Sequence, residues 1–185
     1  MGSSEELVRA TACDIVERLR KNDVTPHDLL DALEARIRKV DGEVNALPIL
    51  CFDRARDQAD ALMKRPLTER GLLAGIPVPI KDLTDVAGVR TTQGSPIFKD
   101  VVAAKSNIVV ENLETNGAIV YAKSNTPEFG AGAQTFNEVF GATRNPWNLS
   151  RSASGSSGGA AAALASGTAW LAHGTDVGGS LRNPA

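Results

Sequence analysis

The residues of this sequence that could do chemistry lie in two glycine-rich turns, each of which carries serine. Residues 155–159 are Gly-Ser-Ser-Gly-Gly, and residues 174–180 are Gly-Thr-Asp-Val-Gly-Gly-Ser. A helix of small residues and a short apolar strand are predicted between the turns, and such a pair of elements can return the chain to its starting point. We therefore expect the hydroxyls of Ser156 and Ser180 to face one cavity. A serine hydroxyl becomes an effective nucleophile only when a base removes its proton.

The base for such a serine is either a histidine or a neutral lysine. His27 and His173 are the only histidines. His27 is predicted in the exposed first turn of a helix, and His173 is expected to pack near the second glycine-rich turn. Lys81 ends an apolar run, but a lysine base must lose its charge. Moving its pKa from about 10.4 to near 7 takes about 4–5 kcal/mol of desolvation or like-charge repulsion. The local pattern alone favours a solvent-exposed strand end for Lys81, because unpaired buried lysines are rare.

Three segments in this order resemble the amidase signature family, whose members include fatty acid amide hydrolase, malonamidase and the amidase subunit of the aminoacyl-tRNA amidotransferase. They are Gly-Ile-Pro-Val-Pro-Ile-Lys-Asp at residues 75–82, followed by the two glycine-rich turns. The resemblance covers roughly residues 72–185, the N-terminal portion of the family pattern. Three ordered motifs are far more specific than one glycine pattern, and the resemblance places Lys81 in the core.

The resemblance implies a serine acyl-enzyme mechanism for the hydrolysis of a carboxylic amide. Lys81 would take a proton from Ser156, which stands on a cis peptide bond in the family, and Ser156 would deprotonate the nucleophile Ser180. Ser157 is expected to support its turn, and Asp176 to fix its loop by hydrogen bonds. No cofactor and no metal are implied. The residues implied for oxyanion or substrate binding are Val177, Gly178 and Gly179, whose backbone N–H groups act with that of Ser180, and Gly130 in the loop of residues 126–132.

Competing motifs at the same place are weaker. Residues 155–159 also fit the G-x-S-x-G nucleophile elbow, with Ser157 as the nucleophile. That elbow follows a strand, and none is predicted over residues 148–154; its acid also precedes its histidine in the chain, whereas His173 precedes Asp176. A phosphate-binding loop lacks its Gly-Lys-Ser/Thr. A purely structural Gly/Ser turn would explain one of the motifs but not all of them.

Length and composition frame the functional alternatives. Family members run to several hundred residues, whereas this sequence has 185 and ends shortly after Ser180. We therefore hypothesise a fragment of a larger amidase that shows no amidase activity without a complementing chain. The alternatives are the amidase (glutaminase) subunit of an aminoacyl-tRNA amidotransferase and an inactive truncated fragment. As partners we expect a small-molecule amide substrate and neither nucleic acid nor membrane. A homodimer is kept as an alternative to a single chain.

The charge and cysteine pattern is that of a cytoplasmic protein. The net charge is −2, which gives no sign of a polyanionic partner. Cys13 and Cys51 lack C-x-x-C spacing and are expected to be free, buried thiols in a reducing compartment. Residues 1–6 contain no apolar run, so no secretory signal is expected. Residues 152–175 lack charge, but they are mostly Gly, Ser and Ala, which argues against a membrane span.

Hydrophobic periodicity predicts an α/β fold with a largely parallel sheet flanked by helices. The resemblance implies that this is the mixed, largely parallel sheet of the amidase signature family, in truncated form. Charged residues are concentrated in residues 1–70, predicted to be an N-terminal helical segment of the same domain. Most glycines lie in residues 71–185, predicted to be an amidase signature core that is incomplete at its C-terminus. Helices are predicted over residues 7–20, 25–41, 53–64 and 106–115, strands over residues 44–52, 72–81 and 118–122, and irregular structure over residues 135–149.

Overall fold

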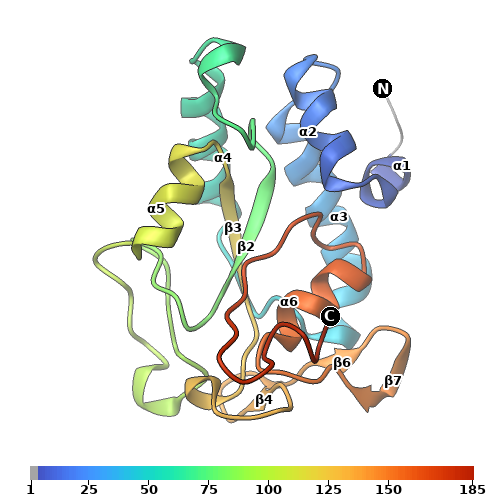
Figure 1. Ribbon diagram of the computed structural model, residues 1–185, viewed down its shortest axis with the longest axis vertical. Coiled ribbons are helices and arrows are strands. Elements are labelled where there is room, and N and C mark those ends of the chain that lie inside the picture. Colours follow the sequence, from blue (N-terminus) through green and yellow to red (C-terminus); the bar gives the residue numbers. More distant parts are fainter. Residues whose placement is uncertain (1–3) are drawn as a thin grey trace.

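The chain folds into a mixed α/β structure in which helices surround a small sheet (Figure 1). The computed structural model describes residues 4–185. Residues 1–3 belong to the segment in which no secretory signal is expected, and they lie outside the described part. The helices are α1 (Ser4–Arg9), α2 (Ala12–Arg20), α3 (Pro26–Val44), α4 (Phe52–Met63), α5 (Ile108–Thr115) and α6 (Gly158–Ala165). The strands are β1 (Ile49–Leu50), β2 (Pro77–Lys81), β3 (Ile119–Ser124), β4 (Phe136–Asn137), β5 (Gly141–Ala142), β6 (Arg144–Asn145) and β7 (Asn148–Ser152).

The central sheet is small, and it is mixed as the family resemblance implied, but only one of its two strand pairs is parallel, so it is not largely parallel. Its order is β1-β3-β2, with β2 and β3 parallel and β1 antiparallel to β3. Helix α5 lies between β2 and β3 in the chain and supplies the long crossover that a parallel pair requires. Strand β1 has two residues rather than the nine predicted, and the rest of residues 44–52 has no strand structure. The register places Lys81 beside Ser124, so the ends of β2 and β3 coincide.

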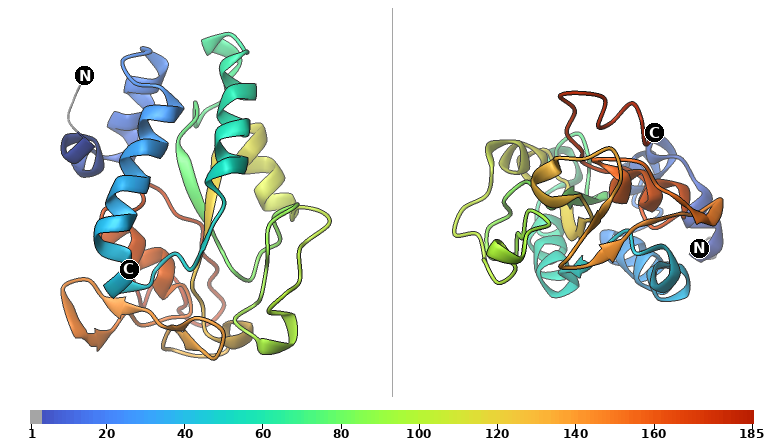
Figure 2. Two further views of the ribbon diagram at one scale, coloured as in Figure 1. Left: turned by 180° about the vertical axis from the view of Figure 1, so that it is seen from behind. Right: turned by 90° about the horizontal axis from the view of Figure 1, so that it is seen from below.

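The helices cover the sheet with apolar faces. Seen from behind, α3 and α4 lie in front of the sheet, while the segment after α6 passes on the other side (Figure 2). Helix α3 buries Leu29, Leu30 and Leu33 completely, and β2 is buried along its whole length. The three leucines and the β2 residues Val78 and Ile80 belong to one hydrophobic cluster that extends to Val120 in β3. This core holds the ends of β2 and β3 in place.

Helix boundaries in the N-terminal part depend on caps that periodicity does not show. The single helix predicted over residues 7–20 is two helices, because the Thr11 side chain caps α2 in a capping box with Asp14. Thr25 begins α3 in the same way. Helix α3 continues through Gly42 to Val44 and ends at Asn45, which has φ 55°. A glycine in the last helical turn therefore did not end the helix, contrary to prediction.

Three further predictions fail in the second half. Residues 135–149, predicted as irregular, contribute short two-stranded pairs, β4 with β5 and β6 with β7. Strand β7 covers residues for which no strand was predicted. The short apolar strand predicted between the glycine-rich turns is absent, although the His173 backbone N–H donates to the Pro79 carbonyl oxygen at 3.0 Å. The predicted boundary at residue 70 stays a prediction.

The cysteines are free, and their burial differs from the prediction. Cys13 is exposed, and Cys51 is half-buried. Burial raises the pKa of the Cys51 thiol to about 11, so this thiol is protonated and unreactive near neutral pH. No helix within residues 4–185 is long and apolar enough to cross a bilayer.

Candidate active site

Lys81 lies at the centre of a buried polar cluster at the end of β2. Its side chain is completely buried. Nζ donates hydrogen bonds to Ser156 Oγ at 2.7 Å, Ser157 Oγ at 2.8 Å and Thr175 Oγ1 at 3.0 Å. An ammonium group has three N–H donors, so this environment can satisfy the charged form completely. The structure places Lys81 in the core rather than at the solvent-exposed strand end that the local pattern favoured.

The surroundings of Lys81 lower the pKa of its amine. Burial lowers the pKa of Lys81 to about 8, while the Asp176 carboxylate acts in the opposite direction. With a pKa of about 8, about a tenth of the amine is neutral at pH 7. The neutral form of the amine can accept a proton from a hydroxyl without further change in its environment.

The first glycine-rich turn presents Ser156 and Ser157 to Lys81. Ser156 follows a cis peptide bond from Gly155, and both serines are almost fully buried. Helix α6 begins directly after them. A Cβ on Gly158 would lie 2.3 Å from Thr135 Oγ1, and a Cβ on Gly159 would lie 2.3 Å from the Asn125 backbone nitrogen. Glycine at these positions therefore lets the start of α6 pack directly against the loops that follow β3.

The second glycine-rich turn is organised by Asp176, as predicted. Its carboxylate accepts hydrogen bonds from the backbone N–H groups of Gly179, Leu181 and Arg182 and from the Arg182 guanidinium. The Arg182 side chain and these backbone donors hold the pKa of Asp176 well below its ordinary value. A carboxylate engaged in this way is fixed as an anion and is a structural clamp rather than a base.

Ser180 is adjacent to the cluster through its backbone. Its carbonyl oxygen accepts a hydrogen bond of 3.1 Å from the Ser157 N–H. Within residues 4–185 its hydroxyl forms no hydrogen bond with Ser156. Of the predicted oxyanion donors, Val177 is fully exposed, Gly178 is exposed, and the Gly179 N–H already donates to Asp176 at 2.8 Å. The structure thus joins Lys81 to Ser156, while the roles of Ser180 and of the oxyanion donors stay predictions.

The loop after β3 borders the same cluster. A Cβ on Gly130 would lie 3.6 Å from Ser156 Oγ and 2.6 Å from Leu83 Cδ1, and Gly130 has φ +68°. A side chain at this position would be strained and would crowd the approach to Ser156. Gly130 therefore lies beside Ser156, and its part in oxyanion or substrate binding stays a prediction.

His173 packs against the backbone of Lys81. Its Nδ1 accepts a hydrogen bond of 3.4 Å from the Lys81 N–H. Burial and the charges of Lys81 and Lys123 lower the pKa of His173, so the ring is neutral at neutral pH. This geometry agrees with the predicted packing role.

The nucleophile elbow remains the weaker interpretation although one argument against it was wrong. Strand β7 does precede the turn, but it is exposed along its length and pairs only with β6. Ser157 Oγ accepts a hydrogen bond from Lys81 and donates to the Thr175 carbonyl oxygen at 3.2 Å. The elbow mechanism needs a histidine at this hydroxyl, and a lysine occupies that place.

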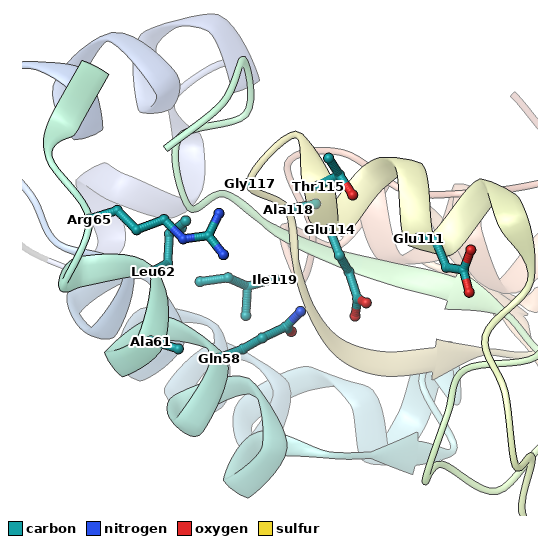
Figure 3. A pocket seen from close by; sticks show the side chains of 10 residues that line it. All are labelled: Gln58, Ala61, Leu62, Arg65, Glu111, Glu114, Thr115, Gly117, Ala118 and Ile119. Atoms are coloured by element: carbon teal, nitrogen blue, oxygen red, sulfur yellow. The ribbon is translucent and has the colours of Figure 1, made fainter. Parts of the chain in front are cut away.

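A separate cavity between α4 and α5 contains none of these residues. It has a volume of about 420 Å³, and Gln58, Arg65, Glu111 and Glu114 contribute polar side chains to it (Figure 3). Glu114 is already paired with Arg54 at 2.7 Å, and Gln58 accepts from the Val120 N–H at 3.2 Å. The first bond joins α4 to α5 and the second joins α4 to β3, so both belong to the packing of these elements and the cavity is not the candidate site.

Sequence reasoning missed the contacts of Ser157 and Thr175 with Lys81. Ser157 was expected only to support the turn, and Thr175 was given no role. A signal was available, because a buried ammonium needs three acceptors and only Ser156 had been identified. The hydroxyls next to the two motif positions were the natural candidates.

Comparison with known proteins identifies relatives of this chain. A family model described as Amidase matches residues 28–185. One subunit of the glutamyl-tRNA(Gln) amidotransferase of Roseiflexus sp. strain RS-1 is 42% identical over 180 residues, which are 97% of this chain and 37% of that protein. The chain thus spans little more than a third of the length of this curated relative.

Solved structures give the same picture. A 6-aminohexanoate cyclic dimer hydrolase complexed with substrate is 34% identical with a TM-score of 0.87, over 96% of this chain and 36% of that one. A bacterial aryl acylamidase is 35% identical with a TM-score of 0.88, over 95% of this chain and 37% of that one. The match extends over nearly the whole chain in sequence and in fold. The chain therefore belongs to the amidase signature family and corresponds to the N-terminal portion of its members.

Proposed function

We propose that this chain carries the reacting groups of an amidase that hydrolyses a carboxylic amide through an acyl-enzyme on Ser180. The observation that supports this most directly is the 2.7 Å hydrogen bond between the buried Lys81 Nζ and Ser156 Oγ. A neutral amine at that distance can take the Ser156 proton. The resulting Ser156 oxyanion is then the base for the Ser180 hydroxyl.

The reaction has two halves. Ser180 Oγ bonds to the carbonyl carbon as its proton passes to Ser156, and the carbonyl electron pair moves onto oxygen. The C–N bond then breaks, and the departing nitrogen takes a proton from Ser156. Water attacks the Ser180 ester by the same relay, which releases the acid and restores the serine. The Ser180 side chain must turn toward Ser156 for the first transfer, and its half-exposed position leaves room for this.

Labelling with a fluorophosphonate tests the proposal, because such probes react with activated serines. The probe is applied to the chain alone and to a chimaera that adds the remaining portion of the aryl acylamidase fold. We expect the chimaera to be labelled on Ser180 and Lys81→Met and Ser156→Ala to lose the label. Ser150→Ala, on the exposed strand β7, is the matched control and keeps it. Labelling on Ser157 or equal labelling of Lys81→Met would contradict the mechanism. The chain alone is expected to show no turnover.

A second candidate is the glutaminase activity of an aminoacyl-tRNA amidotransferase subunit. The relative with 42% identity carries the name of such an amidotransferase, and the same Lys81 relay would then release ammonia from glutamine. Purified chimaera is therefore assayed for glutamine hydrolysis, alone and with the other subunits and tRNA. Glutaminase activity that depends on those partners selects this candidate, whereas partner-independent hydrolysis of simple amides selects the first.

A further inference from the structure

The Lys81 amine is surrounded by three hydroxyl oxygens that are not equivalent. Ser157 Oγ has a single proton, which it donates to the Thr175 carbonyl oxygen at 3.2 Å. It also accepts from the Thr175 N–H at 3.3 Å. Toward Lys81, Ser157 can therefore act only as an acceptor. Thr175 Oγ1, at 3.0 Å, makes its one described hydrogen bond with Lys81 Nζ.

A neutral amine differs from an ammonium in a way that makes this arrangement important. It has two N–H donors and one lone pair, so it can serve only two acceptors and one donor at a time. If Ser157 and Thr175 accept its two N–H groups, the lone pair is left facing Ser156 Oγ, which is the nearest of the three oxygens. If one acceptor is removed, the amine can turn an N–H toward Ser156, which then has no base.

We propose that Thr175 is a positioning residue, which with Ser157 fixes the two N–H groups of neutral Lys81 so that its lone pair points at the Ser156 hydroxyl. The inference rests on the proposed Lys81 relay and assigns a function to a side chain that the relay itself does not use. Thr175 acts through Lys81 and contacts no reacting atom of the substrate. Because Asp176 directly follows Thr175 in the chain, Thr175 connects the amine to the carboxylate that clamps the second glycine-rich turn.

Charged and titratable groups around Lys81 stay the same when Thr175 changes. Asp176 follows Thr175 on its loop and raises the pKa of Lys81 against the effect of burial. His173 on the preceding segment is a neutral acceptor for the Lys81 backbone. Asp82 and Lys123, from the ends of β2 and β3, neutralise each other in an ion pair of 3.0 Å. A Thr175 variant therefore changes one hydrogen bond and no charge.

Thr175→Val tests the inference, because valine keeps the shape of threonine and removes the acceptor. The pKa of Lys81 is read from the ¹³Cε and ¹⁵Nζ shifts of labelled lysine in the 185-residue chain, assigned with Lys81→Met. An ammonium loses more than a neutral amine when an acceptor is removed, so we expect the pKa of Lys81 to fall by about one unit. Thr175→Ser should restore it, and Thr115→Val, on the exposed end of α5, should leave it unchanged.

The rate of Ser180 labelling in the chimaera supplies the second readout. A lower pKa by itself would raise the rate at pH 7, because more amine is neutral. We expect the opposite, a fall of about tenfold or more, because the neutral amine is misdirected. An unchanged Lys81 pKa, or a rate that rises with the neutral fraction, would overturn the inference. Failure of wild-type chimaera to label on Ser180 would instead overturn the proposed function and leave the pKa result standing.

Discussion

Asp82 and Lys123 form a fully enclosed ion pair of 3.0 Å just beyond the end of β2. Asp82 also accepts hydrogen bonds from the backbone and hydroxyl of Thr92, and Lys123 donates to Thr91 Oγ1 at 2.7 Å. Burial lowers the pKa of Lys123, and the Asp82 carboxylate opposes that shift. The pair fastens the loop after Lys81 to the ends of both parallel strands.

Removing one partner of this ion pair should lower the stability of the fold. Lys123→Met leaves the Asp82 carboxylate buried without its counter-ion, and we expect the free energy of unfolding to fall by about 3–5 kcal/mol. Adding Asp82→Asn to that variant removes the unpaired charge and should recover part of the loss. Urea unfolding at pH 7 measures both, with the exposed Lys99→Met as control. If Lys123→Met is as stable as Lys99→Met, the ion pair contributes nothing to the free energy of unfolding.

The labelling reaction should follow the ionisation of Lys81. Because the proposed base is the neutral amine and its pKa is about 8, the rate of Ser180 labelling in the chimaera should rise with pH and level off above about pH 9. Between pH 6 and pH 7 the rate should rise about tenfold. The pH profile of the rate is measured by stopping the labelling reaction at set times and quantifying the labelled protein by intact-mass spectrometry. A midpoint near 6.5 would indicate a histidine base instead.

The same depressed pKa should appear as a pH dependence of stability. Lys81 ionises at about 8 in the folded chain and at about 10.4 when unfolded. Between these values the unfolded state binds more protons, so the contribution of Lys81 becomes more favourable as pH rises and is constant below the lower value. Relative to Lys81→Met, wild type should gain about 2 kcal/mol of unfolding free energy from pH 7 to pH 10.

Lys81→Met is the control built into that comparison, because every other titrating group is present in both proteins. Chemical unfolding at each pH gives the difference directly. A difference that is flat from pH 7 to pH 10 would mean that Lys81 has an ordinary pKa in the folded chain, and the neutral base would then lose its physical basis.

Local sequence predicted those parts of the site that depend on motifs and missed those that depend on packing. The two serine turns stand out because closely spaced glycine and serine residues are chemically distinctive, whereas Lys81 was placed in the core only by the resemblance to the amidase signature family. The local pattern nevertheless favoured a solvated Lys81. Its burial depends on acceptors from residues 156–175, which lie far along the chain and have no local signature.

The fold shows the same division. Strands β2 and β3 were predicted because continuous apolar runs are buried on both faces. The antiparallel β1 was placed but made far too long, since its two residues are defined only by pairing with β3. Strand β7 was missed because its sequence, Asn-Leu-Ser-Arg-Ser, has no apolar face and its pairing with β6 supplies the structure. Periodicity detects burial, and these short exposed strands have little of it.

Ser154 offers a test of strain beside the site. It has φ +60°, a left-handed conformation that costs residues with a Cβ about 1–2 kcal/mol. Its hydroxyl makes only a long contact, 3.4 Å, with the Ala133 carbonyl oxygen. Ser154→Gly should therefore raise the free energy of unfolding by about 0.5–1 kcal/mol, even after the entropy cost of glycine in the unfolded chain. Ser150→Gly, in β7 and outside the left-handed region, should instead lower it. If both glycine variants lose stability in urea, the conformation of Ser154 is not strained.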